Sequence, residues 1–160
     1  MRRKIMEKLI RWKKATGDRL PLLLYGARQV GKTYTMQEFG TEQFKNTVYV
    51  NFETDEAIGT FFESVIKADT IVAMLEKYYH TSIIPEETLI IFDEVQLCER
   101  ALTSLKYFAE EAPEYHVIAA GSLLGVALNR QKLSFPVGKV QMFTMYPLDF
   151  EEYLWAKGKE

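Results

Sequence analysis

Five short runs of apolar residues alternate with segments of helical periodicity along this 160-residue chain. The apolar runs lack the polar-out alternation of a strand with one solvated face, which favours strands buried on both faces of a parallel sheet. The predicted strands are Leu20–Tyr25, Asn46–Phe52, Leu89–Phe92, Tyr115–Ala120 and Val140–Met145.

The intervening segments repeat apolar residues every three or four positions, which predicts helices. These are Lys32–Phe39, Ala57–Ile66, Thr70–His80, Glu99–Glu111 and Leu148–Ala156. Strands that alternate with helices in this way predict a doubly wound α/β domain. The length fits one domain over residues 1–160, with no visible linker or repeat.

The first 19 residues predict a basic amphipathic leading helix. Ile5, Leu9 and Trp12 fall on one face, and eight Lys or Arg residues stand against Glu7 and Asp18 although the whole chain has a net charge of −2. Two interpretations stay open: a solvated outer face, or contact with phosphate or nucleic acid. The segment lacks the apolar core and cleavage site of a secretory signal.

Composition narrows the class of protein further. No apolar run approaches the roughly 18 residues of a membrane helix, and a lone Cys98 cannot form an intramolecular disulfide. We therefore expect a cytoplasmic protein with no membrane contact. His80, His116 and Cys98 do not have the spacing of a metal site, and both histidines are expected at the surface or a sheet edge.

One segment indicates the chemistry. Residues 26–33 read GARQVGKT, the G-x-x-x-x-G-K-[ST] pattern of a phosphate-binding loop, between a predicted strand and a predicted helix. Gly26 and Gly31 are expected to permit a tight loop whose amides surround a β-phosphate. Lys32 would reach the β- and γ-phosphate oxygens, and the Thr33 hydroxyl would bind Mg²⁺. The predicted nucleotide-binding residues are Gly26, Ala27, Arg28, Gln29, Val30, Gly31, Lys32, Thr33 and Tyr34, with the side chains of Arg28 and Gln29 pointing away from phosphate.

Two carboxylates follow the third predicted strand. In a parallel sheet, Asp93 would lie beside the phosphate loop and hold Mg²⁺ together with Thr33, and Glu94 could polarise the attacking water. Ser122 follows the next strand, where it would sense the γ-phosphate or cap a helix over Leu123–Leu128.

Three further charged residues are weaker candidates. Glu53 is expected to be a solvated turn acid rather than a cleft residue. Arg130 and Lys139 are candidates for a positive charge supplied to a neighbouring subunit's nucleotide.

Several motifs together resemble a known family. They are GARQVGKT (26–33), IFDEVQ (91–96), GSLLG (121–125), SFPVGKV (134–140) and YPLDFEEYL (146–154). The combination is similar to the bacterial and archaeal AAA-type P-loop ATPases. These join an N-terminal nucleotide-binding domain to a C-terminal domain of uncertain function, with a nuclease-like function as one alternative.

The resemblance implies a three-layer P-loop NTPase core. Its five-stranded parallel sheet would have the order 5-1-4-3-2, with helices on both faces. It also implies ATP or ADP with Mg²⁺, Lys32 and Thr33 on the phosphates and metal, Asp93 on the metal, Glu94 as the base and Ser122 as the sensor. Many members have Arg where this chain has Lys139, and the family continues beyond the equivalent of Glu160. We therefore expect a lid and a C-terminal domain that this chain lacks.

Two functions from different classes remain. The first is Mg²⁺-dependent hydrolysis of ATP to ADP and phosphate, coupled to a conformational change; the alternative is a nucleotide-gated interaction module with little turnover. A GTPase is disfavoured because no N-K-x-D motif occurs and no D-x-x-G follows the third strand, and a small-molecule kinase would rarely need the Asp93-Glu94 pair. The expected partners are ATP, the C-terminal domain and a second copy of the chain, with weaker support for nucleic acid.

Overall fold

The computed structural model describes residues 1–159 except 16, 18 and 123–137. Most of the predicted elements occur, with ends shifted by a few residues. The elements are α1 (Ile5–Lys14), β1 (Leu22–Gly26), α2 (Lys32–Gln43), β2 (Asn46–Asn51), α3 (Glu56–Phe62), α4 (Ala68–Tyr79), β3 (Thr88–Asp93), the 3₁₀ helix η1 (Val95–Leu97), α5 (Glu99–Glu111), β4 (His116–Ser122), β5 (Gln141–Met145) and α7 (Phe150–Ala156). The largest difference is the leading helix, which spans Ile5–Lys14 and not residues 1–19. The second helix continues to Gln43, and the third ends at Phe62.

The five strands form one parallel sheet in the order β2-β3-β4-β1-β5. Reversed, this is the predicted order 5-1-4-3-2, so the prediction is confirmed. Two features of the register matter for function. Asn51 at the end of β2 lies opposite Asp93 at the end of β3, and Gly26 at the end of β1 lies between Ser122 and Met145.

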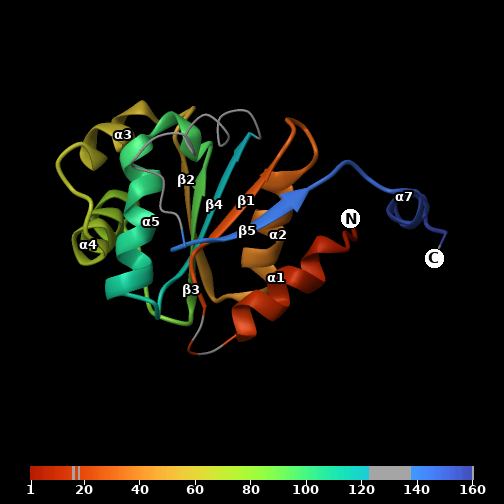
Figure 1. The fold of residues 1–160 in the computed structure, drawn as a ribbon, viewed down its shortest axis with the longest axis horizontal. Coiled ribbons are helices and arrows are strands. Elements are labelled where there is room, and N and C mark those ends of the chain that lie inside the picture. Colours follow the sequence, from red (N-terminus) through yellow and green to blue (C-terminus); the bar gives the residue numbers. More distant parts are fainter. Residues whose placement is uncertain (16, 18, 123–137, 160) are drawn as a thin grey trace.

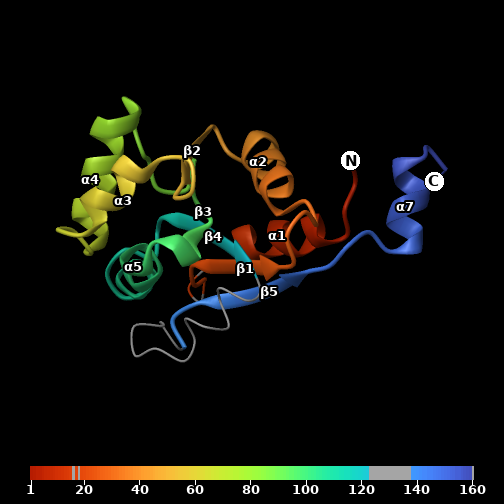
Figure 2. The same cartoon turned by 90° about the horizontal axis from the view of Figure 1, so that it is seen from above.

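Helices cover both faces of this sheet (Figures 1 and 2). Alternate strand residues point to opposite faces. Leu22 and Leu24 therefore pack with residues of α1 and α2, whereas Leu23 belongs to the core shared with α3, α4 and α5. The predicted three-layer architecture is confirmed.

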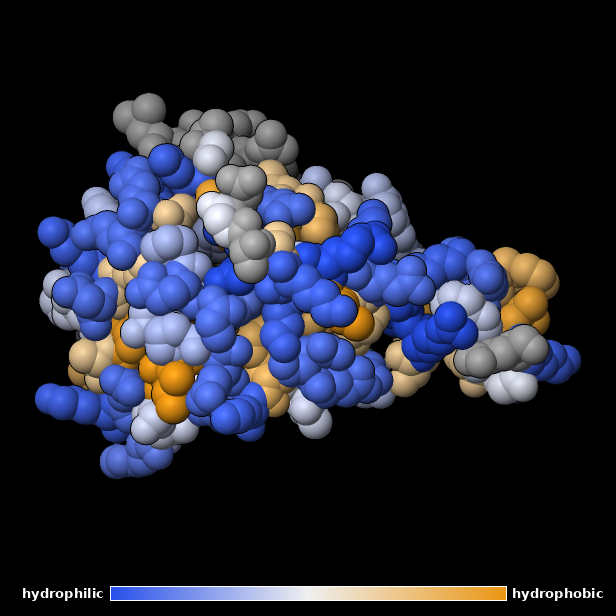
Figure 3. Space-filling model, turned by 90° about the horizontal axis from the view of Figure 1, so that it is seen from below, coloured by the Kyte–Doolittle hydropathy of each residue, from blue (hydrophilic) through white to orange (hydrophobic). Residues whose placement is uncertain are grey.

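Helix α7 projects from the body of the domain, on the same side as the N-terminus (Figures 1 and 2). Asp149 caps it by accepting a hydrogen bond from the Glu152 amide, and the Glu152 carboxylate accepts one from the Asp149 amide, which forms a capping box. Phe150 is 76% exposed, and hydrophobic surface is visible on the projecting end (Figure 3). Among the described residues, no helix is both long and apolar enough to cross a bilayer.

Gly26 is required for a reason that the loop pattern does not reveal. Its φ is not among the positive values of the described glycines, but a Cβ placed on it would lie 2.3 Å from the backbone carbonyl oxygen of Met145 on β5. The neighbouring strand therefore leaves no room for a side chain at the start of the phosphate loop.

We expect Gly26→Ala to lower the free energy of unfolding by about 1–3 kcal/mol, because β5 must shift to accommodate the methyl group. Gly59→Ala is the matched control. Gly59 lies in α3 with open space around its Cβ position, so alanine there should stabilise the helix by up to about 1 kcal/mol. Urea unfolding of both variants measures the difference. Equal stabilities would show that β5 is free to move.

His116 is buried, which corrects the expectation that both histidines lie at the surface; His80 is exposed. The His116 ring makes edge contacts with Trp12 and Phe44, at centroid separations of 5.5 and 5.1 Å. Its position at the start of β4, under α1, puts it inside the sheet–helix layer, a placement that no local pattern predicts. Its Nδ1 is buried without a hydrogen-bond partner in the described part of the chain.

Burial and the nearby Arg19 lower the pKa of His116 from 6.5 to about 4, although the Lys13 carbonyl and Glu86 oppose the shift. As pH falls from 6.5 towards 4, His116 is therefore protonated in the unfolded chain but stays neutral in the folded chain. Folding stability contributed by neutral His116 is present above pH 6.5 and is lost in this window, by about 2 kcal/mol between pH 7 and 4.5.

We expect His116→Phe, which keeps a ring between Trp12 and Phe44, to flatten this part of the pH profile. Denaturant unfolding at pH 7 and pH 4.5 measures the effect as a difference between variant and wild type, so that acid titrations common to both cancel. Parallel profiles would contradict a depressed His116 pKa.

Candidate nucleotide-binding site

The phosphate loop joins β1 to α2 and lies at the carboxyl end of the sheet, which is where ligands bind in open α/β folds. Beside it is a cavity of about 580 Å³. Nearly all the residues around it are ones that the sequence predicted, from three separate elements. They are Arg28, Gln29, Gly31, Lys32, Thr33, Tyr34, Gln37, Glu94 and Ser122, of which Gln37 was not predicted.

The Lys32 side chain folds back onto the backbone of the phosphate loop. Its Nζ donates to the carbonyl oxygens of Gly26 at 3.1 Å and Ala27 at 2.7 Å, and the residue is only 9% exposed. Burial lowers the pKa of Lys32, while the carboxylates of Glu94 and Asp93 oppose that change. Phosphate oxygens could therefore replace these two carbonyl oxygens as acceptors of the Lys32 ammonium hydrogens.

Thr33 and Asp93 are 60 positions apart in the sequence but are in hydrogen-bond contact in the fold. The Thr33 hydroxyl donates to Asp93 Oδ2 at 2.6 Å, and Asp93 is nearly completely buried. A hydroxyl and a carboxylate are hard oxygen ligands of the kind that Mg²⁺ binds together with phosphate oxygens. The donor set therefore fits the predicted metal.

Tyr49 and Asn51 on β2 were not predicted as site residues. The Tyr49 hydroxyl donates to the same Asp93 Oδ2 at 2.5 Å, and Asn51 Nδ2 donates to the Tyr49 oxygen at 3.2 Å. Burial, and then the hydrogen bond to Asp93, raise the pKa of Tyr49 to about 12, so its proton stays in place. The available signal was the parallel pairing of β2 with β3, which aligns Asn51 with Asp93.

Glu94 has a left-handed backbone conformation, with φ 55° and ψ 42°, which is uncommon for a residue with a side chain. Such conformations cost free energy and persist only where the surrounding structure holds them, and they cluster at functional sites. The Glu94 carboxylate accepts a hydrogen bond of 2.6 Å from Gln96 Nε2. Gln96, the last residue of the IFDEVQ motif, was also not predicted as part of the site.

The remaining predicted residues are placed unevenly. Ser122 ends β4 next to Gly26 and borders the cavity, while the helix it was expected to cap lies outside the described residues. Gln29 has a positive φ of 63°, and Arg28 and Gln29 are both exposed at the cavity. Val30 is buried in the core.

Of the weaker charged candidates, the two that the structure describes, Glu53 and Lys139, do not line the cavity. Glu53 is exposed, as expected for a turn acid. Lys139 forms an ion pair with Glu110 at 3.5 Å. Arg130 and most of the SFPVGKV segment lie outside the described residues.

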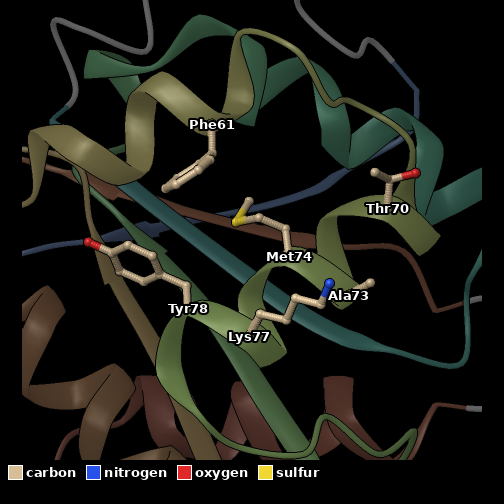
Figure 4. Close-up of a pocket in the computed structure, with 6 residues that line it drawn as sticks. All are labelled: Phe61, Thr70, Ala73, Met74, Lys77 and Tyr78. Carbon is tan, nitrogen blue, oxygen red and sulfur yellow. The ribbon is translucent and has the colours of Figure 1, made fainter.

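A second cavity, of about 430 Å³, lies between α3 and α4 (Figure 4). Its lining is mainly apolar and contains none of the predicted site residues: Phe61, Thr70, Ala73, Met74, Lys77 and Tyr78. This cavity is therefore separate from the predicted nucleotide-binding residues.

A parallel sheet of this order, with the phosphate loop after its first strand, defines a P-loop nucleotide-binding domain. Comparison with known protein families places the chain more closely. The profile of the family AAA_14, described as an AAA domain, matches residues 18–154, and the chain belongs to this family. It is an ATP-binding P-loop ATPase domain of the AAA type.

Solved structures show the same fold at low sequence identity. The Walker-type ATPase PABY2304 of Pyrococcus abyssi is 17% identical, with a TM-score of 0.61 over 97% of this chain and 56% of that protein. Cdc6p of Pyrobaculum aerophilum is 15% identical, with a TM-score of 0.58 over 96% of this chain and 47% of that protein. The chain thus spans about half the length of each. No curated protein matches its sequence significantly.

Proposed function

We propose that this domain binds Mg²⁺ and ATP at the phosphate loop and hydrolyses ATP to ADP and phosphate. The observation that carries the proposal is the convergence of Lys32, the Thr33–Asp93 pair and Glu94 around one cavity. Each of these groups has a separate task in phosphoryl transfer to water.

Binding depends on the loop. The amides of residues 26–33 and the start of α2 offer donors to the phosphates, and Lys32 can exchange its bonds to the Gly26 and Ala27 carbonyls for bonds to the β- and γ-oxygens. Thr33 and Asp93 would hold Mg²⁺, with Tyr49 fixing the Asp93 carboxylate. When bound, Mg²⁺ neutralises charge on the phosphate oxygens.

Hydrolysis depends on Glu94. Glu94 lines the same cavity as the loop, where its carboxylate can accept a proton from a water that attacks the γ-phosphorus. Ser122, beside Gly26, would orient the γ-phosphate by donating its hydroxyl hydrogen. We further propose that residues 1–160 act as one domain and that turnover drives a conformational change.

The alternative is a nucleotide-gated interaction module with little turnover. The observation that favours it is the hydrogen bond from Gln96, which ties up one oxygen of the Glu94 carboxylate. A domain in which Gln96 holds Glu94 away from the attacking water would bind nucleotide but turn it over slowly.

Single-turnover phosphate release separates the two functions. With protein in excess over ATP and Mg²⁺ present, an ATPase releases phosphate at a rate that EDTA abolishes. Nucleotide binding without release would support the interaction module, and absence of binding would contradict both functions.

A further inference from the structure

Arg3 is a basic residue of the leading segment, yet it is only 5% exposed, so it is an exception to the solvated face that most basic residues of this segment form. All three guanidinium nitrogens donate within the domain. Nη1 donates to the Val30 carbonyl at 2.8 Å, Nη2 to the Tyr146 carbonyl at 2.6 Å, and Nε to Glu152 Oε2 at 2.9 Å. One side chain thus joins the phosphate loop, the segment after β5, and α7.

The loop end of this arrangement lies directly behind the phosphate-binding surface. A Cβ on Gly31, which has a φ of 95°, would lie 3.3 Å from Arg3 Nη1, so the guanidinium packs against the loop backbone. In a phosphate loop the amides face the anion, and carbonyls such as that of Val30 need partners elsewhere. Arg3 supplies that partner.

At the α7 end, the Glu152 carboxylate is also held by hydrogen bonds. Glu152 is 6% exposed, and its Oε2 also accepts a hydrogen bond from the Lys4 amide at 2.9 Å. Burial raises the pKa of Glu152, but the hydrogen bonds from the Lys4 and Asp149 amides and from Arg3 lower it by more, so it stays ionised. Removing either partner from such a buried pair leaves an uncompensated charge.

We propose that Arg3 and Glu152 form a buried clamp that positions the phosphate loop and couples nucleotide binding to the orientation of α7. Arg3 acts here as a positioning residue, since it holds the Val30 carbonyl of the loop and does not itself line the nucleotide cavity. The proposal rests on the proposed nucleotide site. Because α7 projects from the body beside the N-terminus, a shift of the loop reaches α7 through this contact (Figures 1 and 2).

The chain carries its own reporter of α7. Trp155 lies in α7 with the Arg2 guanidinium carbon 4.1 Å from its ring centroid. The only other tryptophan in the sequence, Trp12, is a buried residue of α1. In protein labelled with 5-fluorotryptophan, ¹⁹F NMR gives one signal for each, and Trp155→Phe assigns them.

We expect MgADP, or MgATP in the Glu94→Gln protein, to shift the Trp155 signal when the clamp is intact. Arg3→Met should weaken nucleotide binding roughly tenfold and remove the Trp155 shift. Glu152→Met should do the same, and the double variant should lose no more than either single one, because the two residues act as a unit. Arg3→Lys should rescue only in part, since an ammonium cannot serve three separated acceptors.

Lys4→Met is the matched control. It removes exposed ion pairs to Asp149 and Glu151, and an ammonium 5.9 Å from the Trp155 ring centroid, but leaves the Arg3–Glu152 contact in place. The signal of the nucleotide-free variant can therefore differ from wild type, but the nucleotide affinity and the change in the Trp155 signal on nucleotide binding should be those of wild type. Thermal unfolding checks each variant. If Arg3→Met does not fold, Arg3→Lys and Glu152→Gln provide the measurement.

The outcomes separate the two proposals. The clamp is overturned if the wild type binds nucleotide and the folded clamp variants have the same affinity and the same change in the Trp155 signal. The nucleotide site is then still supported. Equal losses in Lys4→Met would also overturn the clamp. Absence of binding in wild type overturns the nucleotide site and the clamp with it.

Discussion

Lys32→Ala is expected to weaken ATP binding about 100-fold or more while the domain stays folded. A hydrogen bond to a charged group contributes about 1.5–3 kcal/mol, and Lys32 is placed to make two of them to phosphate oxygens. The nucleotide-free fold loses only the two hydrogen bonds from Lys32 Nζ to the Gly26 and Ala27 carbonyls.

Titration with a fluorescent ATP analogue measures the affinity, and circular dichroism measures the fold. Lys45→Ala is the matched control, because Lys45 is an exposed lysine paired with Glu87 on the surface. Wild-type affinity in the Lys32 variant would show that the nucleotide binds elsewhere.

Glu94→Gln is expected to slow phosphate release by about 10²- to 10⁴-fold while nucleotide binding is retained. Glutamine has the same shape and can still accept the hydrogen bond from Gln96, so the left-handed backbone at this position has the same support. It cannot accept a proton from water.

Single-turnover release by this variant is compared with wild type and with Glu53→Gln, which alters an exposed acid outside the cavity lining. Equal release by wild type and Glu94→Gln would mean that Glu94 is not the base, and would favour the interaction module. A loss in Glu53→Gln of the same size would show a general effect of removing negative charge.

The parts of the site that the sequence predicts are two short motifs, each of which is continuous in the chain. The loop of residues 26–33 and the Asp93-Glu94 pair each follow an apolar strand. Both strands run parallel in one sheet, so their carboxyl ends are on the same side, and the two motifs meet there. The topology follows from the alternation of strands and helices together with the family resemblance, which is why the fold class and sheet order were predictable.

The parts that were missed depend on which elements are neighbours in space. Tyr49 is an ordinary strand residue until β2 pairs with β3 and brings its hydroxyl to Asp93. His116 gives no local sign of burial, because α1 covers it from 100 residues away. Arg3 was grouped with solvated basic residues, since charge is read along the chain while its acceptors are the distant Val30, Tyr146 and Glu152.

The sequence by itself therefore determined the class of domain, its strands and helices, and the chemical groups that would meet a triphosphate. Local patterns are sufficient for these because strand burial, helix periodicity and loop chemistry act over a few residues. Only the tertiary structure decided why Gly26 must lack a side chain, which residues hold Asp93 and Glu94, and that Arg3 ties the loop to α7. These depend on the close approach of distant segments, where burial decides whether a charge or a methyl group is tolerated.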